Sequence, residues 1–542
     1  MNCEQLILGN IITLDTNKMF AEAMAVKEGR IVYLGSEEIA RTLCDENTQI
    51  LDYEDNVIYP GFIDSHCHGL LAGQRLVWEC DLKPGESMED YMELLKEYIE
   101  KYPDRDCYKG SGWAFYDKPK ASMIDSVCAD KPVILTSIDN HSVWINSIAL
   151  KECRIDKEKA KELGYDLVHV DEEGNPTGWL SETATNIVRE VYKVTVEEMK
   201  EGILAWQDFA FSQGLTAVGE ALVDILEDGE EAYHELNKEG KLKLRTFAYY
   251  SGAKLLKENN LYGLSDNIIE LSERVDSDYF KIAGAKIILD GVVEAHTAYL
   301  KEEYTDKPGH YGILNINEQE TLDKHVLLLN EKGIPVHTHA IGDGAISMIV
   351  NSYEKAELET SNFDIRNSVC HLQYMDESDF KRFADYNIIA VVAPLWVPID
   401  HTLFDNEVKY LGVDRAWNCY PIKALEDAGA TLCFHTDYPG SRSIDAAEQI
   451  YSAVKRRNPN MGPETVKNPE EAISAYSSIL ASTLNCAYLW REEDNLGTLA
   501  IGKIANATVF SDDFLRAEEL NKIEDIKLVA TIVDGEEVYR NE

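Results

Sequence analysis

The feature that most constrains the fold is a regular alternation of short apolar runs with longer amphipathic stretches between residues 60 and 497. Short apolar runs bounded by turn residues indicate buried strands, and apolar positions three and four residues apart indicate helices. Strands that alternate with helices are typical of parallel βα units, either in an open sheet or in a barrel. The strand candidates are KPVILTSI, GLTAVGEALV, KIAGAKIILD, GIPVHTHAIGD, NIIAVVAP and ATLCFHTDYPG, and the helix candidates include SMEDYMELLKEYIEKY and NEQETLDKHVLLLNEKG.

A barrel is favoured over an open sheet because polar residues end several of these runs. TIM-barrel enzymes place their chemistry at the carboxyl ends of the strands. The chain of 542 residues is also longer than a minimal barrel requires. We therefore predict a distorted TIM (β/α)8 barrel over residues 60–497, with insertions around 69–135 and 140–210 that we expect to cap the active site.

Both ends of the chain have the composition of β-strands. Residues 1–59 and 498–542 contain runs such as LILGNIITLD and IKLVATIVDGEEVY. The dipeptide Asp534–Gly535 in the second run is typical of a two-residue hairpin turn. Because chain termini often lie near each other in a domain, we predict one small β-sandwich domain formed by both termini.

Composition and charge exclude several classes of protein. The net charge of −45 disfavours binding to nucleic acid or to an anionic membrane surface. The first residues have no basic segment followed by a long apolar stretch, so we expect no signal peptide, and no run of about 18 apolar residues predicts a membrane span. The 11 scattered cysteines form no CxxC pair, which favours free thiols in a reducing cytoplasm. We therefore expect a cytoplasmic protein with no nucleic-acid or membrane partner.

Side chains that ligate metals end four of the apolar runs. They are His66 and His68, His337 and His339, His371, and Asp437. Residues two apart on a strand face the same side, so two imidazoles of an HxH pair can point at one ion. Nitrogen and carboxylate ligands around an open position are what a catalytic zinc site needs. A nearby carboxylate such as Asp437 can carry a proton from water to a leaving nitrogen. The alternative for any single His is an exposed residue at a strand end.

Several longer motifs add to this pattern. They are GFIDSHCH, DNHSVWINSIAL at 139–150, GNPTGWLSETA at 174–184, KIILDGVVEAHTAYL at 286–300, HAIGD at 339–343, and the ending YLWREEDNLGTLAIGKIANATVF. Their order and spacing resemble the amidohydrolase superfamily, and within it the amidohydrolase family 3 branch of YtcJ-like and N-substituted formamide deformylase-like proteins. The resemblance runs from about residue 5 to about residue 540.

The resemblance implies a binuclear metal centre. It assigns His66 and His68 to the first ion and His339 and His371 to the second. Two further assignments are Lys286, carboxylated by CO₂ and bridging the ions, and Asp437, binding the first ion and acting as general base and then acid. Without the resemblance, Lys286 would be taken as an ordinary lysine near a barrel mouth, although a desolvated lysine loses its charge more easily. Zinc is the expected metal, with iron, manganese or nickel as alternatives.

Further residues are candidates for the substrate pocket. They are His141, Trp113, Trp179, Glu182 and Asp290. Core packing is the alternative for the tryptophans, since aromatic side chains are mostly buried. His337 is a candidate for holding a ligand imidazole in one tautomer.

The chain departs from the family pattern at a few positions. Cys370 replaces the usual Glu before the histidine of the sixth strand, and His435 and Thr436 replace the usual GS before the aspartate. GLTAVGEALV, taken as the third strand, ends in Glu220 where His or Asp is usual. These changes affect the expected substrate more than the reaction class.

The leading hypothesis is a metal-dependent amidohydrolase that hydrolyses the C–N bond of a small-molecule amide or N-acyl compound. One alternative is a deaminase or cyclic-imide hydrolase on the same fold, and another is a non-catalytic binding protein on a barrel. A Rossmann dehydrogenase and a serine hydrolase are disfavoured, because the chain has no GxGxxG after its first strand and no GxSxG. The family habit implies a homodimer.

Overall fold

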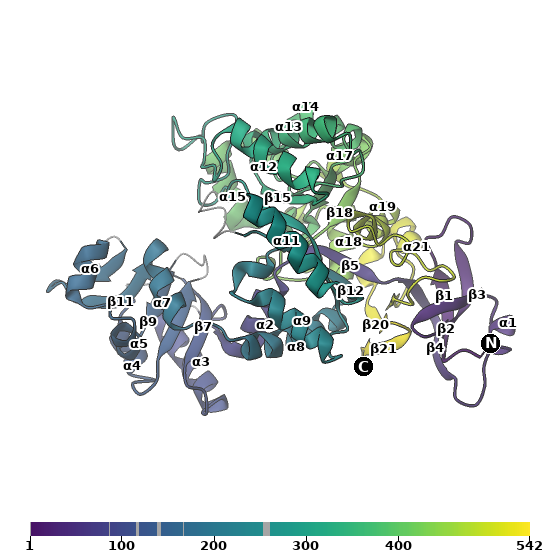
Figure 1. The fold of residues 1–542 in the computed structure, drawn as a ribbon, viewed down its shortest axis with the longest axis horizontal. Helices are drawn as coiled ribbons and strands as arrows, with labels where there is room; N and C mark the ends of the chain where they lie inside the picture. The colour runs from purple at the N-terminus through teal and green to yellow at the C-terminus, as the bar shows by residue number, and fades with distance from the viewer. Residues whose placement is uncertain are drawn as a thin grey trace. The chain divides into compact units, whose positions relative to one another are not determined.

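The computed structural model describes residues 2–85, 87–114, 119–137, 142–165, 167–252 and 261–541. The chain divides into two compact units. The first comprises Met1–Gly69, Gln207–Ile225 and Tyr233–Glu542, and the second comprises Leu70–Trp206 and Leu226–Ala232. Within the described ranges, the strands form three sheets (Figure 1).

The first unit contains the barrel predicted from the sequence. Its sheet has eight strands in the order β18-β17-β16-β15-β14-β13-β12-β5, and each neighbouring pair is parallel. The strands are β5 (Phe62–Cys67), β12 (Leu215–Glu220), β13 (Arg245–Tyr250), β14 (Phe280–Ile288), β15 (Val336–Ala340), β16 (Ser368–His371), β17 (Ile389–Val392) and β18 (Leu432–Phe434). The predicted α/β fold class is therefore confirmed.

The barrel is nearly closed between its first and last strands. The Ser65 hydroxyl donates to the Phe434 carbonyl over 2.7 Å. Beyond the end of β18, the backbone N–H of Asp437 donates to the His66 carbonyl over 2.9 Å. Every residue of β5, β12 and β17 is buried, because parallel barrel strands are covered on both faces. This explains why the strands appear in the sequence as continuous apolar runs.

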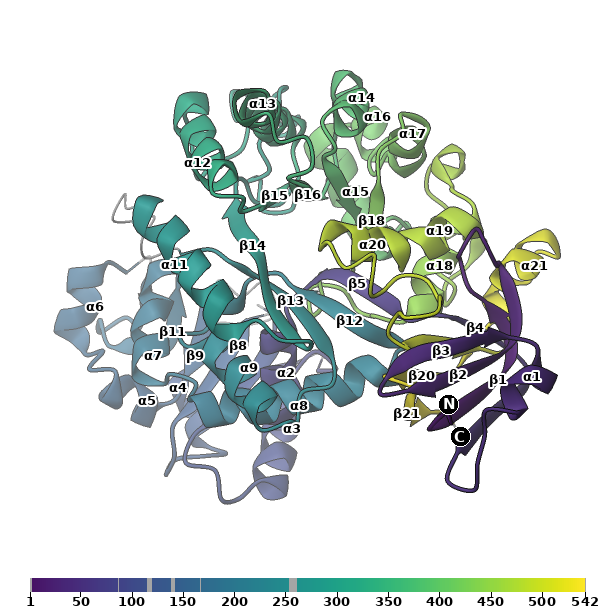
Figure 2. The same cartoon turned by 45° about the vertical axis from the view of Figure 1, so that its right-hand side comes forward.

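Helices connect and cover these strands. In Figure 2, helices α11, α12 and α13 lie outside the strands, and they pack against β14 and β15. The helices of this part of the chain are α8 (Val196–Ser212), α9 (Gly229–Lys238), α11 (Leu261–Val275), α12 (Gln319–Glu331), α13 (Asp343–Thr360), α14 (Glu377–Asp385), α15 (His401–Leu411), α16 (Val413–Trp417), α17 (Ile422–Asp427), α18 (Ala446–Lys455), α19 (Ala475–Ala481), α20 (Leu484–Leu489) and α21 (Phe514–Glu519).

Both chain ends contribute to one seven-stranded sheet, in the order β21-β20-β19-β4-β1-β2-β3. Its strands are β1 (Gln5–Ile12), β2 (Phe20–Lys27), β3 (Arg30–Gly35), β4 (Gln49–Pro60), β19 (Ala507–Phe510), β20 (Leu528–Val533) and β21 (Glu536–Arg540), with helix α1 (Glu37–Arg41) beside them. The predicted hairpin turn is confirmed: Val533 pairs with Glu536, and Asp534 and Gly535 have φ of 54° and 81°. Two positive φ angles are what a type I′ turn requires. The sheet is tied to the barrel through Arg245, whose guanidinium contacts Asp534 at 2.5 Å.

The second unit has its own six-stranded sheet, in the order β10-β11-β9-β8-β7-β6. Its strands are β6 (Glu79–Asp81), β7 (Tyr108–Trp113), β8 (Val133–Ser137), β9 (Ser142–Ile145), β10 (Val168–Val170) and β11 (Pro176–Ser181). The main helices are α2 (Gly69–Trp78), α3 (Met88–Lys101), α4 (Ala121–Asp125), α5 (Ser147–Glu152), α6 (Lys157–Leu163) and α7 (Thr185–Val191).

Two strand predictions differ from the structure in the neighbours of the strand. KPVILTSI is confirmed as a strand, β8, and pairs parallel with β7, but it lies in the second sheet and pairs antiparallel with β9 on its other side. GLTAVGEALV forms β12, which lies directly beside β5 and is the second strand of the barrel in chain order, not the third. Both errors arise because an apolar run reports burial but not the identity of its neighbouring strand.

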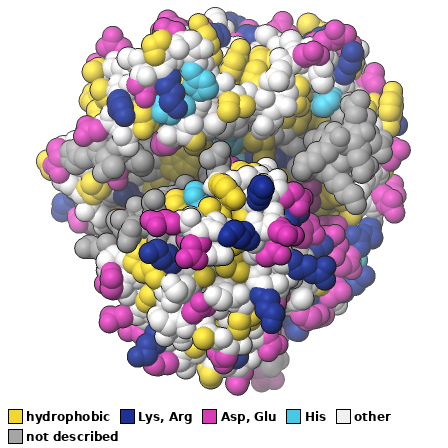
Figure 3. Space-filling view, turned by 90° about the vertical axis from the view of Figure 1, so that its left-hand side faces the viewer, with side chains coloured by type: hydrophobic (Ala, Val, Ile, Leu, Met, Phe, Trp, Pro, Cys, Tyr) yellow, Lys and Arg dark blue, Asp and Glu magenta, His cyan; other side chains and the backbone are white. Residues whose placement is uncertain are grey.

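Within the described residues, no helix is long and apolar enough to cross a membrane. Acidic side chains are scattered over the face in Figure 3 and interspersed with Lys and Arg. The strong net negative charge is therefore distributed over that face and not gathered in one patch.

Candidate metal centre

The six side chains predicted to ligate metals come from five strands or strand ends of the barrel. His66 and His68 end β5, Lys286 lies on β14, His339 on β15 and His371 on β16, and Asp437 follows β18. All eight strands are parallel, so these side chains meet at the carboxyl ends of the strands. The structure thus brings together residues separated by up to 371 positions in the chain.

Asp437 is the centre of one group of ligands. Its Oδ1 atom lies 3.0 Å from His66 Nε2 and 3.3 Å from His68 Nε2. The ligand atoms of His66, His371 and Asp437 all lie within 4.8 Å of one another. One ion can therefore be reached by imidazole and carboxylate donors, which is the donor set of catalytic zinc sites.

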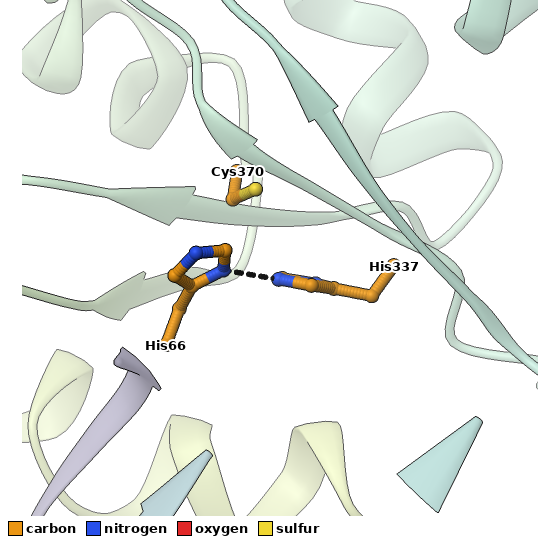
Figure 4. A group of neighbouring side chains, drawn as sticks. All are labelled: His66, His337 and Cys370. Carbon is orange, nitrogen blue, oxygen red and sulfur yellow. Dashed lines mark hydrogen bonds between the residues drawn. The ribbon is translucent and has the colours of Figure 1, made fainter. Parts of the chain in front are cut away.

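A second group adjoins the first on its buried side. His66, His337 and Cys370 also place their ligand atoms within 4.8 Å of one another, and Figure 4 shows these three side chains converging. His66 Nδ1 and His337 Nε2 share a hydrogen bond of 2.6 Å. His337 Nδ1 lies 2.7 Å from the Ser368 hydroxyl, so both of its ring nitrogens are engaged. His337 therefore fixes the orientation of His66, as a partner of a metal ligand does.

Lys286 is buried beside this group, and its Nζ donates to Cys370 Sγ over 3.5 Å. Burial lowers the pKa of the Lys286 amine, although Cys370 and Asp437 oppose the shift. Burial also raises the pKa of the Cys370 thiol to about 12. Cys370 thus occupies the position where the family usually has Glu, as a neutral thiol in contact with the lysine.

His339 and His371 lie side by side, with ring centroids 4.5 Å apart. His339 Nδ1 is 3.3 Å from Asp290 Oδ1. Asp290 was predicted to contact substrate, yet it is only 1% exposed, and its carboxylate accepts backbone N–H groups from Tyr299, Ile341 and Gly342. In this structure Asp290 joins the backbone that follows β15, the strand of His339, to the backbone at Tyr299.

Three members of this cluster were not among the residues predicted to bind metal or substrate, although His435 was noted two positions before Asp437. His435 is fully buried, with its ring centroid 5.1 Å from that of His66 and 5.0 Å from that of His371. Asp64 is fully buried and accepts hydrogen bonds from the Thr436 hydroxyl and from the backbone of His66 and Thr436. Both residues lie two positions before a predicted ligand, which is the same spacing that identified the HxH pairs.

The third is Trp396, whose ring stacks on His371 at 5.2 Å with an interplanar angle of 3°. It lies in a short 3₁₀ turn, Pro394–Trp396, after β17. No local pattern in NIIAVVAP predicts this contact, because it depends on the spatial order of β16 and β17.

The electrostatics of the cluster keep four buried imidazoles neutral and Asp437 charged. Burial lowers the pKa of His66, His337 and His371 well below the ordinary value, and that of His435 to about 4. Burial alone would raise the pKa of Asp437, but the hydrogen bond with His68 and the neighbouring imidazoles hold it below its usual range. Neutral imidazole and ionised carboxylate are the forms that bind metals.

Backbone conformation at the site is unusual for residues other than glycine. His371 has φ of 80° and Asp437 has φ of 58°, both in the left-handed region. Such conformations persist where the surrounding structure holds them, and they concentrate at functional sites. Two of the predicted ligands are therefore held in place by the backbone at some energetic expense.

The residues present fit a divalent metal. Among the described residues, the buried atoms His371 Nδ1, His435 Nδ1 and His435 Nε2 have no hydrogen-bond partner. A buried polar atom without a partner destabilises the fold by about 1–3 kcal/mol, so several in one cluster are explained by a ligand they would share. The nitrogen and carboxylate donors favour zinc or a similar transition metal over calcium or magnesium.

The other predicted substrate residues belong to the second unit. Trp113 is fully buried, its indole N–H donates to the Leu135 carbonyl over 2.8 Å, and its ring meets Trp144 edge-on. Trp179 stacks on His169 with ring centroids 3.6 Å apart. Glu182 is exposed in the short turn Glu182–Ala184. His141 lies outside the described residues.

Comparison with known proteins gives the family. The model of the amidohydrolase family matches residues 49–539. The chain belongs to the amidohydrolase family. This confirms the resemblance recognised in the sequence motifs, and it supports a metal-dependent hydrolase.

Relatives of this amidohydrolase are similar over nearly their whole length. It is 27% identical to Protein LONG AFTER FAR-RED 3 of Arabidopsis thaliana, covering 98% of this chain and 90% of that one. It is 27% identical to the putative amidohydrolase YtcJ of Bacillus subtilis, over 96% of each chain. It is 23% identical to N-substituted formamide deformylase of Arthrobacter pascens, over 98% of this chain and 97% of that one.

A solved structure also matches this amidohydrolase. An uncharacterized metal-dependent hydrolase from Pyrococcus furiosus superposes with a TM-score of 0.75 and 25% identity, covering 95% of this chain and 100% of that one. The barrel and the terminal sheet are thus parts of an established architecture.

Proposed function

We propose that this amidohydrolase hydrolyses the C–N bond of a small-molecule amide or N-acyl compound. The observation that carries the proposal is the convergence of His66, His371 and Asp437 within 4.8 Å at the carboxyl ends of the barrel strands. The names of two relatives, a putative amidohydrolase and an N-substituted formamide deformylase, support a C–N bond as the target.

In this proposal the residues divide into two sets of ligands. His66, His68 and Asp437 hold one divalent ion, zinc in the first instance, and His339 and His371 hold a second. When bound, such ions polarise a carbonyl oxygen and lower the pKa of water. His337 and Ser368 are not among these ligands in the proposal. The hydrogen bond with Ser368 holds the ring of His337, and the hydrogen bond with His337 fixes the ring of His66.

Asp437 is proposed as the proton carrier. Its pKa is held below the usual range, so the carboxylate is ionised at neutral pH and can accept a proton from the attacking water. It then donates that proton to the leaving nitrogen, which departs as a neutral amine. The left-handed backbone conformation at Asp437 holds the carboxylate toward His66 and His68 during both transfers.

Lys286 is proposed to carry a carbamate that bridges the two ions. Only a neutral amine reacts with CO₂, and burial of Lys286 favours the neutral form. Incubation with ¹³C-bicarbonate and zinc should give a carbamate carbon resonance that is lost in Lys286→Gln. Absence of that resonance from fully metal-loaded wild-type protein would exclude the bridge.

The test of the function combines metal content with an amide screen. Purified wild-type protein should contain metal by mass spectrometry, and His66→Ala should lose most of it. Against the best amide substrate, Asp437→Asn should lower kcat by more than about 100-fold, because a positioned proton carrier contributes about that much or more. Asp385→Asn is the matched control, since its side chain is 48% exposed and pairs with Lys381 on helix α14.

Two results would contradict the proposal. The first is wild-type protein that contains no metal and binds none after addition of zinc with bicarbonate. The second is hydrolysis of an amide that Asp437→Asn leaves unchanged.

A further inference from the structure

A cavity of about 390 Å³ in the first unit shares a wall with the metal centre. Trp396 lines the cavity and stacks on the ligand His371. The Trp396 indole N–H donates to the Ser441 hydroxyl over 2.7 Å, and that hydroxyl donates to the carbonyl of Thr436, the residue before Asp437. A molecule in this cavity therefore lies against the side chains that hold the metal centre in place.

The walls of the cavity are mainly aromatic and aliphatic. They include Trp396, Phe404, Tyr420, Leu395, Ile399 and Met461. Aromatic faces carry negative charge density, so they attract a cation as well as apolar groups. The cavity is large enough for the non-reacting part of a small substrate.

The two basic side chains at the cavity each have an acidic partner. Lys467 Nζ lies 2.7 Å from Glu407, and both side chains are buried, at 3% and 7% exposed. Gln373 donates a further hydrogen bond of 2.9 Å to Glu407. Arg442 contacts Glu448 at 3.5 Å and is 49% exposed, so solvent screens its charge. Lys467 is therefore not available to receive an anionic ligand, and Arg442 contributes only a solvent-screened charge at the edge of the cavity.

Glu294 is the carboxylate at the cavity without such a partner. Among the described residues, no side chain forms a hydrogen bond or an ion pair with it. Glu294 is exposed to solvent, although the protein near it still raises the pKa of the carboxyl through desolvation. The neighbouring Glu407 raises the pKa further, and Lys467 lowers it. A cation placed beside Glu294 would stabilise the ionised form.

We infer that this cavity receives the part of the substrate remote from the scissile bond, and that this part carries a positive charge, such as a primary ammonium group. Glu294 supplies the counter-charge, and the apolar walls enclose the carbon skeleton that carries the ammonium group. The rings of Phe404 and Tyr420 already face Lys467 Nζ, at 4.9 and 5.8 Å, so the carboxylate is the main source of the preference for a cation. The strongly acidic molecule, with a net charge of −45, would also raise the local concentration of cations. The inference rests on the proposed function for the position of the scissile bond, but recognition of the cation does not depend on turnover.

The test uses calorimetry to measure the affinity of metal-loaded protein for three ligands. The ligands are similar in shape, and one is positively charged, one is neutral and one is negatively charged. The probes are 2-phenylethylamine, 2-phenylethanol and phenylacetate, none of which contains an amide. For the wild type, we expect the amine to bind at least about 10-fold more tightly than the alcohol, and the carboxylate to bind most weakly. Glu294→Gln should bring the amine and the alcohol to equal affinity.

Two further variants keep the result interpretable. Glu294→Asp retains the charge and should retain a preference for the amine, which a merely misfolded variant would not. Glu302→Gln is the matched control, because its carboxylate is 80% exposed and does not line the cavity. It should behave as the wild type.

The inference is overturned if the alcohol or the carboxylate binds the wild type as tightly as the amine, if none of the three probes binds, or if the preference survives in Glu294→Gln. Failure of the proposed function has a different signature. A protein that hydrolyses no amide can still prefer the amine in these titrations, and an active hydrolase can lack that preference.

Discussion

Replacement of Asp290 by alanine tests whether this residue holds the backbone of the site or contacts substrate. Asp290 follows β14 and is 1% exposed. Its Oδ1 accepts the N–H of Ile341 at 3.0 Å, and its Oδ2 accepts those of Tyr299 and Gly342, each at 2.9 Å. One carboxylate therefore joins the backbone at Tyr299 to the backbone at Ile341 and Gly342, directly behind His339.

The expected loss in the free energy of unfolding follows from these three hydrogen bonds. A hydrogen bond to a charged group contributes about 1.5–3 kcal/mol, and alanine leaves all three N–H groups without that partner. Partial entry of water offsets part of the loss, so we expect the free energy of unfolding to fall by roughly 4 kcal/mol. Asparagine keeps one acceptor oxygen, and Asp290→Asn should lose only about half as much.

The assay is equilibrium unfolding in urea, followed by tryptophan fluorescence on wild-type protein and both variants. Asp385→Ala is the matched control, since removal of an exposed carboxylate usually changes the free energy of unfolding by less than about 0.5 kcal/mol. If Asp290→Ala were as stable as the wild type but had lost activity, Asp290 would be a substrate contact and the structural role argued here would be refuted.

His337→Phe should weaken metal binding by about 10- to 100-fold, because the 2.6 Å hydrogen bond that orients His66 is lost while the ring shape is kept. Competition with a chelator measures this, and unchanged affinity would contradict the positioning role. The metal-free protein should lose stability as the pH falls from about 6.5, the ordinary pKa of histidine, through about 4, the value for His435. Three further histidines of the cluster, His66, His337 and His371, have pKa values lowered in the same direction, so the unfolded chain binds more protons over this range. Asp64 acts in the opposite sense, because its pKa is raised to about 7 and its contribution is lost as the pH rises, and Glu357, outside the cluster, does the same. These two carboxyls oppose four imidazoles. Stability of the metal-free protein that is constant or rises on acidification, measured by urea unfolding, would contradict the neutral state of the cluster.

Much of the barrel could be predicted because its strands are buried on both faces. β5, β14, β15 and β18 each appear in the sequence as an apolar run that ends in a polar residue. The hairpin at Asp534–Gly535 was predictable for a similar reason, since its left-handed φ angles select particular residues. Burial and local backbone conformation both restrict the residue types that a position can hold, so they can be predicted from the sequence.

Neighbour relations between strands could not be predicted in this way. β8 has the same apolar pattern as a barrel strand but pairs in the second sheet. β13, with the sequence RTFAYY, was not recognised at all, although it completes the barrel between β12 and β14. Residue types show that a strand is buried, but they do not show which strand lies beside it. That neighbour is set by the fold of the whole chain.

The sequence by itself determined the family, the barrel and the residue types that can bind a metal, because each of these depends on local pattern and on the order of motifs. Only the tertiary structure decided that His435 and Asp64 join the cluster, that Cys370 contacts Lys286, and that Glu294 lines a cavity next to the metal centre. These relations join residues tens to hundreds of positions apart. Their energies come from burial and from short-range contacts, which exist only once the strands are assembled.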